Sequence, residues 1–358
     1  MKKLNGYPRK YFYLLLILLL FLTIEVFSFI FIKLKLIPKY LPPVVTLYAH
    51  DVYSYWHPVN KKLKISTLCW ESEVEFNSLG IKSNKEFPLK KIKPRIGILG
   101  DSMTENIQLN NNKDFAYKLQ NKLKNYEIIN FSVASTGLAD QIEIYKNLMI
   151  QFELDYVFLF ITENDFSDNY IESRRPNRIS YKIYDNKIIK IERDKVFLEN
   201  YFSKFNIFKR EYFLYLKQLN SYKTYFYFRE NIPVIIQNLR SNKNNKNNNN
   251  YKFLEEKKII YKYLSQQFLN EIKNNQKIFI FFNINNHNFI HESQIRTIMK
   301  ESWNPKIVND PSIESITFLK KINKLSFPYM GYTCDGHYSE LGAEFLSSYV
   351  SNIFLKHK

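Results

Sequence analysis

The residues with the clearest chemical potential are Gly100-Asp101-Ser102, which follow the apolar run at 95–99. Glycine at the end of a strand allows a tight exit, after which a serine hydroxyl can project into a crevice. Serine is unreactive until a neighbouring base takes its proton, so this serine needs a base from elsewhere in the chain. Taken alone, Gly, Asp and Ser are ordinary turn residues, and an isolated GDS is more typical of a turn than of a catalytic site.

Two further short segments supply the missing groups. Asp335-Gly336-His337 places a carboxylate and an imidazole two residues apart, so the acid can fix the tautomer of the base. Thr162-Glu163-Asn164-Asp165 offers a side-chain amide that can donate to an oxyanion. Each has an ordinary alternative, because His337 could be a solvated surface histidine and Asn164 could cap a helix. Together the three segments supply a nucleophile, an amide donor, an acid and a base.

Strand-like and helix-like segments alternate along the chain, which predicts a parallel sheet covered by helices on both faces. Strands are expected at 95–100, 127–133, 155–162 and 277–284. Ligands bind at the carboxyl ends of such strands, so GDS and TEND are expected at the same edge. Inward-facing helical positions are expected before the third strand and near the C-terminus, at Phe115, Leu119, Leu123, Ile142, Leu148, Met149, Phe152, Leu341, Phe345, Tyr349 and Ile353.

On GDS at 100–102, TEND at 162–165 and DGH at 335–337, the sequence resembles the SGNH hydrolases, also called GDSL esterases. The resemblance implies a flavodoxin-like, three-layer α/β/α fold with a parallel sheet. It also implies Ser102 as the nucleophile, His337 as the base and Asp335 as the partner of the base. No cofactor is implied.

The same resemblance implies an oxyanion hole made by the Ser102 backbone N–H, a second-block backbone N–H and the Asn164 amide. The second block corresponds to residues 130–137, where Ser135 stands in place of the family's glycine and Gly137 is the alternative. The third block opens with Thr162 where the family has Gly. The close spacing of acid and base is like that of cell-surface glycan acetyltransferases. The run FNSLGIK at 76–82 resembles one that precedes GDS in membrane-anchored bacterial members.

The N-terminal region contains an apolar run from Tyr11 to Ile32, long enough to cross ~30 Å of hydrocarbon as a helix. Glu25 is its one charged residue. A cleaved signal peptide is the alternative, but the run is longer than a usual signal core and no small-x-small cleavage site follows it. One more basic residue precedes the run than follows it, which favours a cytoplasmic N-terminus. We therefore expect a single anchor, with the catalytic domain outside the cytoplasm.

Composition narrows the classes of partner. A chain of 358 residues with 45% hydrophobic content can bury one main domain and carry additional segments. The net charge of +18 suggests nucleic acid or anionic membrane, but no groove-reading or base-stacking module is present, so nucleic acid is not expected. Cys69 and Cys334 fit a single bridge or two free thiols rather than a zinc site. His287 and His291 lie four apart without a carboxylate at a matching step, so no metal is predicted.

The sequence thus predicts a basic cytoplasmic tail at 1–10, an anchor at 11–33, an extracytoplasmic lead-in at 34–90 and an SGNH hydrolase-like domain at 91–358. An insert at about 166–275 is expected to be mostly helical. The predicted function is that of a serine esterase acting on acyl or acetyl esters of an extracytoplasmic glycan or lipid. The alternatives are an O-acyltransferase of cell-surface polysaccharide and a catalytically degenerate, glycan-binding member.

The insert contains a dense aromatic tract at 197–228 and an Asn-rich stretch at 241–250 typical of a disordered linker. Aromatic residues among lysines and arginines can form an amphipathic helix that lies in a lipid interface as a lid. The alternative is a helix whose aromatic stripe packs onto the domain. The stripe is defined by Phe205, Phe208, Tyr212 and Tyr215.

Overall fold

The chain forms two compact units. The computed structural model describes residues 9–34, 36, 48–50, 52–67, 69–170, 178–191, 219–221, 223–225, 228, 250–272, 276–283, 294–303, 308–311 and 336–358. The smaller unit comprises Met1–Val44, Ser66–Leu68 and Ser203–Lys246. The larger unit comprises Val45–Ile65, Cys69–Phe202 and Asn247–Lys358.

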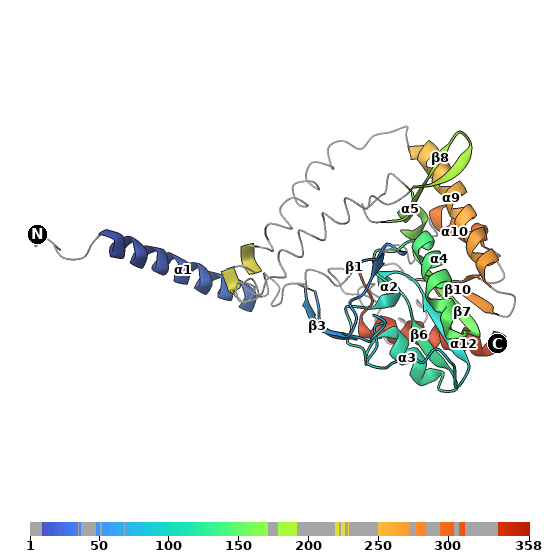
Figure 1. Ribbon diagram of the computed structural model, residues 1–358, viewed down its shortest axis with the longest axis horizontal. Helices are drawn as coiled ribbons and strands as arrows, with labels where there is room; N and C mark the ends of the chain where they lie inside the picture. Colours follow the sequence, from blue (N-terminus) through green and yellow to red (C-terminus); the bar gives the residue numbers. More distant parts are fainter. Residues whose placement is uncertain are drawn as a thin grey trace, which may run out of the picture. The chain divides into compact units, whose positions relative to one another are not determined.

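A five-stranded parallel sheet forms the centre of the larger unit (Figure 1). The spatial order β11-β10-β7-β5-β6 corresponds to the flavodoxin-like order 2-1-3-4-5. All four predicted strands are confirmed, whereas β11 is too short to leave a pattern in the sequence. The strands are β5 (Arg95–Leu99), β6 (Glu127–Asn130), β7 (Tyr156–Ile161), β10 (Lys277–Phe282) and β11 (Val308–Asn309).

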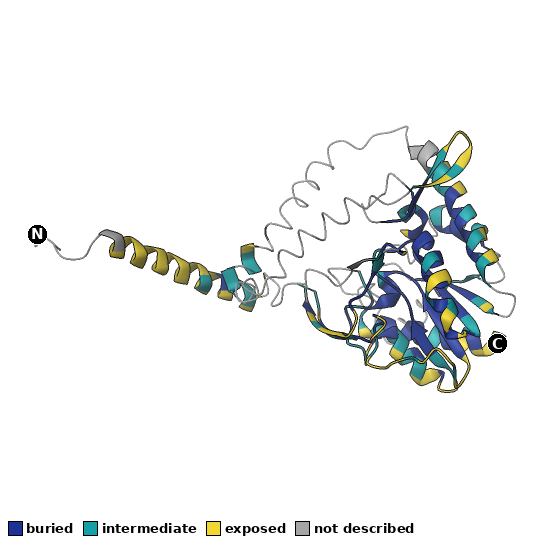
Figure 2. Ribbon diagram, in the orientation of Figure 1, coloured by how far each residue is buried: buried dark blue, intermediate teal, exposed yellow. Residues whose placement is uncertain are grey.

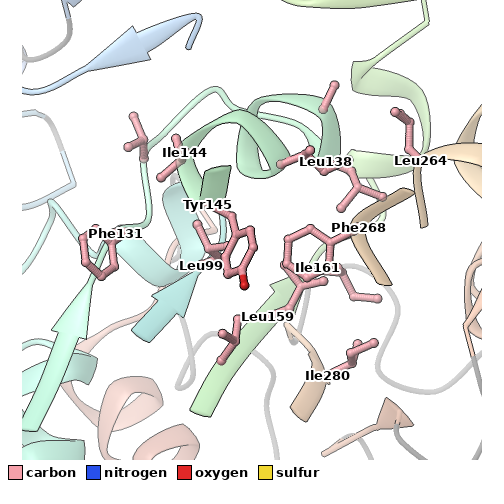
Figure 3. Close-up of a cluster of buried hydrophobic side chains, with 14 of the residues drawn as sticks. Leu99, Phe131, Leu138, Ile144, Tyr145, Leu159, Ile161, Leu264, Phe268 and Ile280 are labelled. Carbon is pink, nitrogen blue, oxygen red and sulfur yellow. The ribbon is translucent and has the colours of Figure 1, made fainter. Parts of the chain in front are cut away.

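Helices cover both faces of the sheet and complete three layers. Alternate residues of β7 enter different cores: Leu159 and Ile161 pack on one side, Phe158 and Phe160 on the other. Burial on both faces explains why the strands read as unbroken apolar runs. The first core is closed by α4 (Leu138–Asn147), η1 (Met149–Phe152), α9 (Asn250–Glu271) and α10 (Gln294–Ser302), and part of it is drawn in Figure 3. The second is closed by α3 (Phe115–Lys122) and α12 (Glu340–His357).

Most of the predicted inward-facing positions are buried, but the stripe expected on α12 was partly wrong. Phe345 is buried, whereas Leu341, Tyr349 and Ile353 are only half-buried. Apolar residues occupy two neighbouring stripes of this helix, so spacing alone cannot select the stripe that packs. The second core takes Leu346, Val350 and Phe354, each one position along from an expected residue, together with Ala343 and Phe345. Leu148 is likewise half-buried, unlike its neighbour Met149.

The insert contains a β-hairpin, which was not predicted from the sequence, since a mostly helical insert was expected. Strands β8 (Ser180–Tyr184) and β9 (Lys187–Ile191) pair antiparallel, with Tyr184 opposite Lys187. The two turn residues, Asp185 and Asn186, have φ values of 50° and 57°. Positive φ at both central residues is the geometry of a type I′ turn, for which Asp and Asn are suitable residues. The aromatic stripe at 205–215 lies outside the described residues.

The lead-in to the sheet is built from two small two-stranded sheets. One pairs β1 (Tyr48–Ala49) with β2 (Tyr55–Trp56), and the other contains β3 (Lys61–Ser66) and β4 (Glu71–Phe76). Cys69, between β3 and β4, is disulfide-bonded, and Cys334 lies outside the described residues. The lead-in therefore has defined structure of its own.

In the smaller unit, α1 (Arg9–Lys33) is a helix long and apolar enough to cross a membrane from Tyr11 to Lys33. Most of its side chains are exposed in the structure (Figure 2). Glu25 is an exception, because its carboxylate accepts hydrogen bonds from the backbone N–H groups of Asn220 and Ser221 at 2.9 and 2.8 Å. These are the first residues of a helical segment, so Glu25 supplies the acceptors that a helix N-terminus lacks. Ser28, one turn further, is buried.

Candidate active site

Ser102 is the first residue of α2 (Ser102–Glu105), the short helix that follows β5 directly. Asp101 is its N-cap and accepts a hydrogen bond from the Met103 N–H at 3.0 Å. Thr104 packs closely against Gly100, and a Cβ at position 100 would lie only 2.6 Å from Thr104 Oγ1. A glycine is therefore required at this position. The GDS segment is therefore a strand-to-helix turn at the carboxyl edge of the sheet, as predicted.

The structure brings His337 to Ser102. The imidazole Nε2 lies 3.0 Å from the serine Oγ, although 235 residues separate the two in sequence. The next residue, Tyr338, is buried, and its carbonyl accepts a hydrogen bond from Gln108 Nε2 at 3.0 Å. This distance between Ser102 and His337 is suitable for direct proton transfer. Asp335 lies outside the described residues.

The third block is tied to the nucleophile turn through the buried carboxylate of Asp101. Its Oδ2 accepts from Thr162 Oγ1 at 2.8 Å and from the Asn164 amide at 3.3 Å. Asn164 also donates to Asp168 at 2.8 Å. Because an amide has two N–H hydrogens, both are engaged here, and the longer contact with Asp101 is the weaker of the two.

The second block is a tight loop after β6. Ser135 has φ of +64°, a conformation that glycine adopts without strain. Gly137, the alternative position, has φ of −112° and is the N-cap of α4. Of the two, Ser135 therefore has the backbone conformation that favours glycine, in agreement with its place in the resemblance.

Two buried carboxylates lie on either side of Thr162. Burial raises the pKa of Asp165 well above its ordinary value, and the charge of Asp101 raises that pKa further. Burial also raises the pKa of Asp101, although the hydrogen bonds that this carboxylate accepts act to lower it. The Thr162 hydroxyl has one hydrogen, which the 2.8 Å contact with Asp101 uses, so its 3.3 Å contact with Asp165 is favourable when Asp165 is protonated and donates.

Several residues that position the site were not found from the sequence. Asn283, directly after β10, donates to Thr104 Oγ1 at 3.0 Å, and Asn130, at the end of β6, donates to the Thr104 carbonyl at 2.9 Å. Both are polar residues at the carboxyl ends of buried strands, which is the signal that could have identified them. Gln108 carried no such signal. His287 and His291 lie outside the described residues, and among the described ones no group of three potential ligands could hold a metal ion.

No family model matches the chain, and no curated protein matches its sequence. The chain is similar to solved lipases and esterases. A lipase/acylhydrolase from Enterococcus faecalis is 9% identical over 73% of this chain and 95% of that chain, with a TM-score of 0.39. An acetyl xylan esterase is 12% identical over 72% and 98%, with a TM-score of 0.36. A putative lipolytic protein of the G-D-S-L family from Desulfitobacterium hafniense is 10% identical over 73% and 99%, with a TM-score of 0.28.

The raised pKa of Asp165 predicts a pH-dependent stability. Between the ordinary and the raised pKa, Asp165 is protonated in the folded chain and ionised in the unfolded chain, so the stability that this group contributes is fully present below its ordinary pKa and is lost as pH rises through the raised value. We expect the thermal midpoint of the full chain in detergent to fall between pH 5 and pH 8, and to fall less in Asp165→Asn, whose amide is neutral at every pH. The exposed turn residue Asp185, replaced by Asn, serves as the control. An equal fall in wild type and Asp165→Asn would contradict the prediction.

Proposed function

We propose that this chain is a serine esterase of the SGNH hydrolase type. The observation that carries the proposal is the 3.0 Å contact between His337 Nε2 and Ser102 Oγ at the carboxyl edge of a flavodoxin-like sheet. In such sheets this edge is the usual place for a ligand. A serine within hydrogen-bond reach of a histidine is the arrangement that nucleophilic acyl transfer requires.

The first half of the proposed reaction forms an acyl-enzyme. His337 Nε2 takes the proton of Ser102 as Oγ attacks the carbonyl carbon of an ester. The resulting tetrahedral intermediate collapses when the imidazolium returns that proton to the departing alkoxide oxygen. Asp335, two residues before the base, is the proposed partner that orients the imidazole, as the resemblance implies.

Negative charge on the carbonyl oxygen needs donors that are already in place. The proposed donors are the backbone N–H groups of Ser102 and Ser135 and the side-chain amide of Asn164. Asn164 gives both its hydrogens to carboxylates in the structure, so we propose that the weaker 3.3 Å contact with Asp101 is exchanged for the oxyanion. The exchange retains the 2.8 Å contact with Asp168, which keeps the amide oriented.

The second half of the reaction transfers the acyl group from Ser102 to an acceptor. Water as the acceptor gives an esterase, whereas a sugar hydroxyl gives an O-acyltransferase with the same covalent intermediate. The proposed substrates are acyl or acetyl esters on an extracytoplasmic glycan or lipid, a choice supported by the N-terminal helix. A glycan-binding member without an acyl-enzyme is the outcome that the first test below would reveal.

We further propose that α1 is an uncleaved anchor with the catalytic domain outside the cytoplasm. The charge difference across the apolar run supports this orientation. Retention of the helix is supported by Glu25, because cleavage after α1 would remove the acceptors for the N–H groups of Asn220 and Ser221.

The Ser102→Ala variant tests the nucleophile. We expect a serine-directed fluorophosphonate to label the wild-type chain and not the variant, and turnover of an acetyl ester to fall by about 10⁶-fold, as for loss of the nucleophile in a comparable triad. Intact-mass spectrometry and initial rates give the two readouts. A wild-type chain that never labels, or a variant that turns over equally well, would falsify the esterase proposal.

The Asn164→Ala variant tests the proposed oxyanion donor. Loss of one such donor costs roughly 10² to 10³ in kcat, so a reduction of that size is expected with little change in KM. Ser167→Ala, in the short helix α5 (Asp165–Asp168) that Asn164 precedes as N-cap, is the matched control. An unchanged kcat in Asn164→Ala would remove this residue from the site.

A reporter fused to the C-terminus tests the topology. An enzyme that is active only outside the cytoplasm should be active when joined to the full chain in a bacterial host. The matched fusion carries a reporter that is active only in the cytoplasm and should be silent. The opposite pattern would invert the proposed orientation.

A further inference from the structure

A buried ionisable pair, His57 and Glu105, lies at the end of α2, the helix that begins with Ser102, and the proposed reaction does not use it. His57, from the lead-in just after β2, is 4% exposed, and Glu105, the last residue of α2, is fully buried. Their side chains meet with His57 Nε2 2.8 Å from Glu105 Oε1. The pair therefore links the lead-in to the helix that begins with Ser102.

The hydrogen-bond partners of His57 fix its protonation at one nitrogen. Nδ1 lies 2.9 Å from the carbonyl oxygen of Gly80, which can only accept, so Nδ1 carries a hydrogen. Gly80 is itself constrained, because it has φ of +75° and a Cβ there would lie 2.9 Å from the His57 carbonyl. One further proton between Nε2 and Oε1 satisfies the pair completely.

The second carboxylate oxygen of Glu105 reaches the proposed oxyanion loop. Oε2 accepts a hydrogen bond from the Ala134 N–H at 2.8 Å. Ala134 immediately precedes Ser135, whose N–H is a proposed oxyanion donor and whose φ of +64° is uncommon for a residue with a side chain. A restraint on the peptide before Ser135 therefore acts on the placement of that donor.

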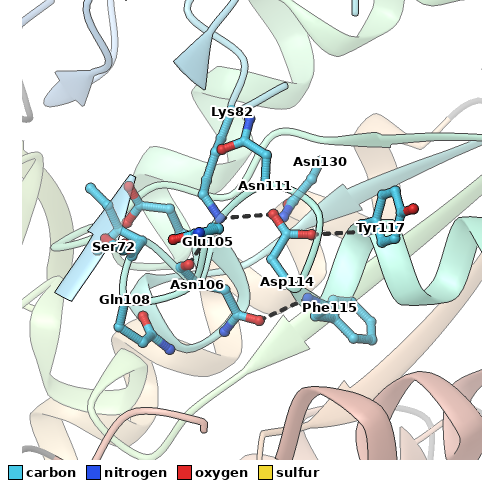
Figure 4. A network of polar contacts seen from close by, with 12 residues as sticks. Ser72, Lys82, Glu105, Asn106, Gln108, Asn111, Asp114, Phe115, Tyr117 and Asn130 are labelled. Carbon is cyan, nitrogen blue, oxygen red and sulfur yellow. Dashed lines mark hydrogen bonds and ion pairs between the residues drawn. The ribbon is translucent and has the colours of Figure 1, made fainter. Parts of the chain in front are cut away.

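A second contact from the lead-in reaches the same helix end. Lys82, at the end of the run 76–82, donates to the Asn106 carbonyl at 2.9 Å and to Asp114 at 2.7 Å (Figure 4). Asn106 is the C-cap of α2 and has φ of +56°. The residues that close α2 are thus held by two residues of the lead-in, Glu105 by His57 and Asn106 by Lys82.

We propose that His57 and Glu105 are positioning residues for acyl transfer, which hold the second-block loop at the distance from Ser102 that an oxyanion hole requires. The proposal rests on the proposed esterase function. Glu105 is the central member, because its two oxygens join the lead-in to the loop. His57 acts through Glu105 by fixing the orientation of the carboxylate.

Two replacements of Glu105 separate positioning from a role of the charge. In Glu105→Gln the amide oxygen can accept from Ala134 while the amide nitrogen donates to His57 Nε2, so every hydrogen bond survives. In Glu105→Ala the Ala134 N–H loses its acceptor. With 4-nitrophenyl acetate and the full chain in detergent, we expect Glu105→Ala to lower kcat by about 10²-fold, the lower end of the cost of one oxyanion donor, with KM within about threefold of wild type. Glu105→Gln should retain most of the wild-type kcat.

The control must distinguish lost positioning from lost stability, since breaking a buried ion pair also destabilises a fold. Arg296 is as deeply buried and pairs with Asp310 at 2.7 Å beside β10 and β11. Arg296→Met should lower the thermal midpoint and leave kcat unchanged. Should Glu105→Ala fail to fold, His57→Phe in the Glu105→Gln background keeps an aromatic ring at position 57 and leaves no ionisable group in the pair. It should lower kcat about tenfold, the worth of one hydrogen bond.

Three results would overturn the proposal. They are a folded Glu105→Ala with kcat within about threefold of wild type, a Glu105→Gln that loses as much as the alanine variant, and, where the alanine variant does not fold, a double variant with unchanged kcat. Ser102→Ala is measured in the same series. A wild-type chain without labelling or turnover refutes the esterase and the positioning role together, whereas an active wild type with an active Glu105→Ala refutes the positioning role alone.

Discussion

The arrangement of the site depends on one buried carboxylate, that of Asp101. One oxygen accepts from the Met103 N–H and so caps α2, and the other accepts from Thr162 and Asn164. The segments that follow β5 and β7 are therefore joined through this side chain. These three donors offset part of the cost of burying the carboxylate, whereas an apolar residue in its place would leave the donors without an acceptor. The second residue of GDS therefore has a structural task that is separate from the chemistry of the third.

The short helix α2 is the point at which the other strand ends are anchored. Thr104 alone accepts from Asn130, the first residue of the second block, and from Asn283, directly after β10. The lead-in adds contacts at Glu105 and Asn106, from His57 and Lys82. Such convergence explains how four residues of helix can hold a serine in one place, since a helix this short has little stability of its own. It also explains why an ordered segment of four small strands precedes the first strand of the sheet.

The sequence was sufficient for the sheet, because its strands follow from apolar runs. The meeting of Ser102 with His337 was expected from the resemblance on GDS, TEND and DGH, since in the described part of the chain His337 is at no strand end of the sheet. The sequence was insufficient where a choice depended on packing. The buried stripe of α12 could not be selected because apolar residues occupy two adjacent stripes, and β11 pairs over only two residues. The hairpin at Asp185 and Asn186 was signalled by its turn residues, but the helix-like spacing of the aromatic residues at 205–215 led us to expect a mostly helical insert. His57 and Glu105 are 48 residues apart, and the residues around them in the sequence show no repeating pattern. Residue spacing therefore could not reveal the contact between them.

The hydrogen bonds between Glu25 and the insert bear on the order in which the chain is made. Asn220 leaves the ribosome 195 residues after Glu25, when β1 through β9 have already been synthesised. With α1 as the proposed anchor, the carboxylate has none of these donors during insertion, and the leucines and isoleucines around it, each worth about −0.3 to −0.6 kcal/mol at the centre of a membrane helix, must compensate for it. The smaller unit is completed only after residues 220 and 221 have been synthesised. Its biogenesis therefore ends with a late closing step, in which the translated insert returns to a helix made long before it.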